Sequence, residues 1–141
     1  MNHPWTTGLD RDQWTDKHTG LLCLAVRGPL GAWCGYVAVP TGHPWHGLAF
    51  HDLPRIDVHK GVNYAADGDE DITSGAGQPD GRWWIGFSCD HIGDLVPASY
   101  ERMGELAQVM CEDTYRDLGY VRREINALAE AVRDAAVEAA R

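Results

Sequence analysis

The sequence is poor in basic residues and has no long hydrophobic run. Lysine and arginine total 12 against 21 aspartate and glutamate, so the net charge is -9. Nucleic-acid backbones and anionic membrane surfaces attract positive charge, so an acidic chain matches them poorly. No apolar stretch approaches the roughly 18 residues that a membrane-spanning helix requires, and the first residues lack a signal-peptide pattern. We therefore expect no nucleic-acid or membrane partner, and we expect the chain to stay in a cytoplasm.

Cysteine is scarce, and several catalytic signatures are missing. Cys23, Cys34, Cys89 and Cys111 are scattered and form no Cys-x-x-Cys pair, so we expect buried free thiols rather than disulfides or metal ligands. The sequence has no Gly-x-Ser-x-Gly elbow, no His-Glu-x-x-His pair and no Gly-x-x-x-x-Gly-Lys phosphate loop. These absences favour binding over catalysis, and we expect neither a catalytic residue, a metal nor a cofactor.

The sequence changes character once along its length. At 141 residues, 44% of them hydrophobic, the chain suits one domain and not two. We expect 1–19 to form an N-terminal extension, 20–97 to be mostly β and 98–141 to be mostly helical. The prediction is an α+β fold in which a small antiparallel sheet of about four strands precedes two C-terminal helices. The β-prone runs are 21–27, 32–39, 56–64 and 83–87, and the turn-rich loops are 40–52 and 67–81.

Two amphipathic helices are expected at the end of the chain. Ser99 can cap the first and Asp117 the second. Because two such helices on a small domain can also pack on a neighbouring subunit, we expect a homo-oligomer. The apolar positions are Met103, Leu106, Ala107 and Met110 in the first helix, and Val121, Ile125, Leu128, Ala129, Val132 and Ala136 in the second.

Arg116, Arg122 and Arg123 gather around the start of the second helix, flanked by Tyr115 and Tyr120. Arginine there faces the positive end of the helix dipole, which is unfavourable by about 0.3–1 kcal/mol unless an anion offsets it. A bound phosphate would do so, because helix N–H groups and guanidinium groups both donate to phosphate oxygens. Alternatively, the arginines pair on the surface with Asp113, Asp117 or Glu124.

The stretch RWWIGFSCDHIGD at 82–94 places three aromatic rings just before two carboxylates and an imidazole. Adjacent strand residues point to opposite faces of a sheet, so Trp84 faces away from the layer of Trp83, Ile85 and Phe87. Trp84 either fills a second apolar layer or forms a platform on which a base stacks.

Asp90, His91 and Asp94 follow these rings. They can cap a turn, bind ribose hydroxyls or ligate a metal. Beside stacking rings and arginines, ribose binding would suit a nucleotide better than other ligands. The alternative is a metal-dependent nucleotide hydrolase that uses His43 and His46 with this cluster, although the histidine spacing matches no metal motif. A third interpretation is a structural protein whose terminal helices serve assembly alone.

Three stretches resemble the first Thoeris anti-defence family of phage proteins: WCGYVAVP at 33–40, WWIGFSCDHIGD at 83–94 and YRDLGYV at 115–121. The resemblance spans roughly residues 20 to 130. It implies a sheet followed by helices, assembly from dimers up to hexamers, and a sponge that sequesters a cyclic ADP-ribose isomer in the host cytoplasm without cleaving it. Such sequestration evades bacterial immune signalling.

The resemblance also implies ligand contacts at a subunit interface. Trp84 and Phe87 match the family's aromatic segment, and the three arginines match its basic helix start. For Phe87 this conflicts with strand alternation, which places the ring in the core. The 67–81 loop and the 98–112 stretch have no counterpart in the family pattern, so the choice of ligand stays open.

Overall fold

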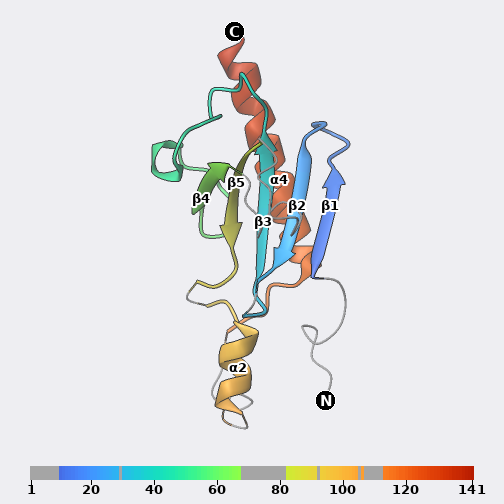
Figure 1. Ribbon diagram of the computed structural model, residues 1–141, viewed down its shortest axis with the longest axis vertical. Helices are drawn as coiled ribbons and strands as arrows, with labels where there is room; N and C mark the ends of the chain where they lie inside the picture. The colour runs from blue at the N-terminus through green and yellow to red at the C-terminus, as the bar shows by residue number, and fades with distance from the viewer. Residues whose placement is uncertain (1–9, 29, 68–81, 92, 105, 107–112) are drawn as a thin grey trace.

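A five-stranded antiparallel sheet with strand order β1-β2-β3-β5-β4 forms the centre of the molecule (Figure 1). This computed structural model describes residues 10–28, 30–67, 82–91, 93–104, 106 and 113–141. The α+β prediction is confirmed, with five strands in place of four. In the described part of the chain, no helix combines the length and apolar composition that a membrane crossing needs. The elements are β1 (Arg11–Thr15), β2 (Leu22–Arg27), β3 (Trp33–Val39), η2 (Phe50–Asp52), β4 (Tyr64–Asp67), β5 (Trp83–Ser88), α2 (Pro97–Met103) and α4 (Leu118–Ala139).

The prediction that 1–19 is an extension is wrong at Arg11–Thr15, because β1 is an edge strand of the sheet, whereas residues 1–9 lie outside the described part of the chain. It pairs with β2, and Trp14 lies opposite Cys23. Trp14 packs against the main core, whereas the rest of β1 is polar. A short edge strand with one apolar residue gives little alternation signal, which explains the error.

The strand expected at 56–64 is also wrong in its position. Ile56 and Val58 are buried as their alternation suggested, yet they lie in a loop. Gly61 N donates to Val58 O at 2.8 Å to close a turn, and Lys60 and Gly61 both have positive φ, 54° and 81°. This turn interrupts the extended chain, so β4 begins only at Tyr64.

One face of the sheet carries the main core. α4 crosses this face behind β2 and β3 (Figure 1). A Cβ atom on Gly35 would lie 2.6 Å from both Ile125 and Phe87, so glycine is what permits the close approach of the helix. Asp117 caps α4 as predicted, since its Oδ1 accepts from Tyr120 N at 2.8 Å. The predicted stripe is buried at Val121, Ile125, Leu128, Ala129 and Val132, whereas Ala136 is exposed.

The connection between β3 and β4 completes this face. It carries η2 and passes beside β4 (Figure 1). Trp45, Ile56 and Val58 from this connection belong to the main core. The expectation of an exposed loop at 40–52 is therefore wrong at His43 and Trp45, which are both buried.

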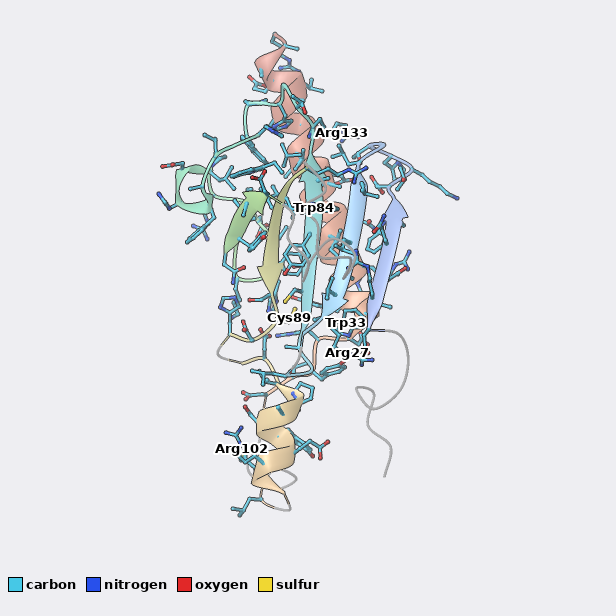
Figure 2. All side chains as sticks on the ribbon, viewed as in Figure 1. Arg27, Trp33, Trp84, Cys89, Arg102 and Arg133 are labelled. Atoms are coloured by element: carbon cyan, nitrogen blue, oxygen red, sulfur yellow. The ribbon has the colours of Figure 1, made fainter. Side chains whose placement is uncertain are left out.

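The opposite face holds a second, smaller cluster formed by Leu24, Ala38 and Trp84. Figure 2 labels Trp84 on the sheet. The prediction that Trp84 faces away from Ile85 and Phe87 is confirmed, because those two residues belong to the main core. The stacking platform is contradicted, since Trp84 is only 1% exposed and presents no free ring face.

α2 extends beyond the end of the sheet (Figure 1). Its N-cap is Val96, with Pro97 at the first position, so Ser99 is not the cap that was expected. Met103 and Leu106 are 42% and 61% exposed, so these apolar positions do not face the core. The expected helix positions Ala107 and Met110, the expected free thiol of Cys111, and loop residues 68–81 lie outside the described residues.

Candidate functional site

Three segments that are distant in sequence meet near the end of β5. They are the turn after β5, the Val58–Gly61 turn and the chain leading into α4. Leu95 N donates to Thr114 O at 2.8 Å, and Thr114 N donates to Gly93 O at 2.9 Å. These two backbone bonds fasten the turn after β5 to the approach to α4 and place Asp94 between them.

Asp94 is the centre of this junction. Its side chain is fully buried and accepts three hydrogen bonds, from His59 Nε2 at 2.7 Å, His91 N at 3.1 Å and Arg116 Nε at 3.0 Å. Burial alone would raise the pKa of Asp94, but the bonds from His59 and Arg116 outweigh it and hold the pKa below the ordinary 3.8. The carboxylate is therefore ionised at neutral pH. We call Asp94, His59, His91, Arg116 and Tyr120 the Asp94 centre.

The ionised carboxylate fixes the orientation of His59. Asp94 can only accept hydrogen bonds, so His59 Nε2 carries the proton. In neutral His59 the other nitrogen, Nδ1, then accepts from the Tyr120 hydroxyl at 2.6 Å. Burial, and then the charge of Glu124, raise the pKa of Tyr120, so the phenol stays protonated. The result is an ordered Tyr120–His59–Asp94 chain.

Arg116 presents the positive charge of the centre. Its Cζ atom lies 4.9 Å from the centroid of the Tyr120 ring, and its Nε donates to Asp94. The side chain is 26% exposed. The terminal guanidinium nitrogens have no hydrogen-bond acceptor within the described ranges. Arg116 is thus held flat and rigid while its remaining donors stay available.

A polar rim borders the centre. Asn63 Nδ2 donates to Ser88 Oγ at 2.8 Å, and Ser88 Oγ donates to Asp90 Oδ1 at 2.7 Å. Asn63 Nδ2 also lies 3.5 Å from His91 Nε2. These short polar side chains and the His91 ring are of the type that binds ribose hydroxyls.

The structure brings together part of the predicted site. Asp90, His91, Asp94, Arg116 and Tyr120 lie at the Asp94 centre or on its rim. Asp94 accepts from His91 N, so the turn-capping interpretation is confirmed for that residue.

The other predicted residues lie elsewhere. Tyr115 packs against the main core and interacts with Arg27 of β2. Phe87 is 1% exposed in the main core, which agrees with strand alternation and leaves no face for a ligand. Trp84 is buried on the opposite face of the sheet.

The three arginines are separated by their partners. Arg122 forms an ion pair with Asp12 and lies 4.4 Å over the ring of Trp14. Arg123 is exposed and makes no ion pair with any described residue. The alternative, surface pairing with Asp113, Asp117 or Glu124, is wrong for Arg116 and Arg122, whose partners are the buried Asp94 and the distant Asp12.

The residues of the hydrolase alternative do not converge. His43 Nε2 bonds to Val132 O at 2.6 Å, and His46 Nδ1 bonds to Val39 O at 3.0 Å. Val132 is twelve residues beyond Tyr120 on α4, which is about 18 Å along the helix. Within the described ranges, no group of three or more His, Cys, Asp or Glu side chains is placed to hold a metal ion.

Sequence reasoning missed the central role of His59. The available signal was the histidine directly before Lys60-Gly61, a pair that marks a turn. Asn63 was missed because its partners Ser88 and His91 are distant in sequence.

The fold and the site define a single-sheet α+β domain with a buried carboxylate that organises a polar surface. Comparison of the chain with protein-family models, curated proteins and solved structures finds no match.

Proposed function

We propose that the chain binds a cyclic ADP-ribose-type nucleotide and sequesters it without cleavage, as a phage anti-defence sponge in the host cytoplasm. The observation that carries the proposal is the Arg116 side chain, 26% exposed, which is held by Asp94 and the Tyr120 ring. Asp94 also binds His91 N, and the His91 ring lies next to the Asn63 amide and the Ser88 hydroxyl of the polar rim. A preorganised guanidinium can donate to phosphate, and the polar rim can bind ribose. The family resemblance supplies the choice of a cyclic ADP-ribose isomer.

The pKa values of the cysteine thiols and of Tyr120 support retention of the ligand rather than its turnover. Covalent catalysis needs a nucleophile with a lowered pKa or an adjacent base that accepts its proton. Burial instead raises the pKa values of Cys23, Cys34 and Cys89. Tyr120 has a base beside it in His59, but its own pKa is raised and Asp94 already accepts three donors. The centre is better suited to holding a ligand than to attacking it.

We also propose that the protein self-associates, as a dimer or a hexamer built from dimers. The α4 stripe does not require this, because the stripe is buried within one chain. Support comes from the exposed apolar side chains of Leu30, Met103 and Leu106. Leu30 lies beside the first turn of α2, because Ala98 N donates to Leu30 O at 2.9 Å. Sedimentation velocity would reveal a monomer if the proposal is wrong.

The test incubates the protein with cyclic ADP-ribose isomers, removes free nucleotide, denatures the protein and analyses the released material by mass spectrometry. We expect intact nucleotide. Arg116→Gln should weaken binding by about ten- to a hundred-fold, because a hydrogen bond to a charged group contributes about 1.5–3 kcal/mol. Arg133→Gln is the matched control, since Asp134 is the one carboxylate with which Arg133 pairs in the described part of the chain. Altered nucleotide would indicate an enzyme, and no retention would refute nucleotide binding.

A further inference from the structure

A pocket lies against the segment 50–62, which carries η2, and none of its lining residues belongs to the Asp94 centre. Its volume is about 650 Å³, within the range of roughly 300–1,000 Å³ typical of small-molecule sites. Buried Ile56 and Val58 form part of its apolar lining. Phe50, whose ring is 48% exposed, lies on its border. The pocket therefore offers an aromatic side chain and some apolar surface within a lining that is mostly polar.

Two positive charges border the same pocket. Arg55 and Lys60 both line it, and neither makes an ion pair with a described residue. Asp57 is a lining carboxylate, so the charge balance of these three residues is positive. In a chain with a net charge of -9, two pocket cations that pair with no carboxylate among the described residues favour an anionic ligand.

Lys60 occupies a backbone position that suits glycine. Its φ is 54°, and the turn closes through the bond from Gly61 N to Val58 O. Non-glycine residues adopt this left-handed conformation only at a cost in free energy. The turn places His59 in the Asp94 centre and the next residue, Lys60, on the pocket. Two consecutive residues, His59 and Lys60, thus belong to the centre and to the pocket, respectively.

Arg55 and Lys60 provide positive charge in addition to that of the arginines near the start of α4. Arg116 is paired with Asp94 and Arg122 with Asp12, so a ligand with two phosphate groups carries more negative charge than Arg116 alone offsets. We propose that the 50–62 pocket binds the phosphate-bearing part of the ligand through Arg55 and Lys60. The identity of that ligand as a nucleotide rests on the proposed function, whereas the preference for a phosphate anion rests on the pocket itself.

The test measures binding of a cyclic ADP-ribose isomer and of inorganic pyrophosphate by titration calorimetry. Lys60→Gly removes the charge and also relieves the backbone strain, so it should not lower the melting temperature. We expect both Lys60→Gly and Arg55→Gln to weaken pyrophosphate and nucleotide binding about ten-fold or more, with a steep loss at high salt. The controls are Lys17→Ala and Arg102→Gln, which remove charges from the exposed β1–β2 turn and from α2 (Figure 2).

The outcomes separate this inference from the proposed function. If the nucleotide binds and Lys60→Gly and Arg55→Gln leave its affinity unchanged, the pocket assignment is overturned and the function stands. If pyrophosphate binds in a Lys60-dependent way while no nucleotide binds, the pocket stands and the function fails. Equal losses in the Lys17→Ala and Arg102→Gln controls would show general charge attraction and overturn the inference.

Discussion

Replacing Asp94 with asparagine should destabilise the protein far more than an equivalent change on the surface. The carboxylate is fully buried and accepts hydrogen bonds from His59, His91 N and Arg116. Asparagine keeps the size, but it removes the charge that faces Arg116 and turns an N–H group toward a donor. Removing one partner of a buried ion pair typically destabilises by about 3–5 kcal/mol. In a domain of this size that corresponds to a fall of about 10–20 °C in Tm.

Chemical denaturation followed by tryptophan fluorescence and thermal unfolding followed by circular dichroism would measure this change. Asp12→Asn is the matched control, because Asp12 also pairs with an arginine, Arg122, that is 45% exposed. A surface pair of this kind contributes about 0–1 kcal/mol. An Asp94→Asn variant within 1 kcal/mol of the wild type would refute the claim that Asp94 organises the site.

Three further predictions concern Asp94, Trp84 and the buried cysteines. Folding lowers the pKa of Asp94, so the carboxylate stabilises the protein above its unfolded-state pKa, and this stabilisation is lost as the pH falls through its folded-state pKa. The difference in unfolding free energy between wild type and Asp94→Asn should therefore be constant from about pH 5 to 7 and narrow below about pH 4. Trp84→Ala should destabilise the fold by about 3–5 kcal/mol, and Trp84→Phe by less. Neither variant should change the nucleotide affinity of the folded protein. A loss of affinity without a loss of stability would instead support Trp84 as a stacking platform. Burial raises the pKa of Cys23 to about 12 and raises that of Cys89, so a thiol reagent followed by mass spectrometry should label both only after unfolding.

The sequence could predict the features that depend on local periodicity. Alternation in β5 placed Trp84 on one face and Ile85 and Phe87 on the other, and the structure agrees. The Asp117 cap and the α4 stripe were also predictable, because cap chemistry and helical spacing are local. Alternation could not show whether the second face is buried, and Trp84 therefore looked available for a ligand.

The features that depend on distant segments could not be predicted. β1 is a strand only because β2 offers it an edge, and its own sequence has one apolar residue. The pairing of Arg122 with Asp12 joins residues 110 positions apart. His59 reaches Asp94 across 35 positions through a turn that depends on the unusual backbone of Lys60. No local pattern encodes contacts of this range.

The central claim, nucleotide binding at the Asp94 centre, is tested most directly by an NMR titration of the isotopically labelled wild-type protein with cyclic ADP-ribose isomers. The account predicts saturable shifts in the Arg116 side-chain N–H signal, the His91 ring signals and the Asn63 amide signal. No signals of a nucleotide cleavage product should appear during the titration. Absence of shifts at these groups at saturating nucleotide, or shifts confined to α2 or to the far end of α4, would contradict it.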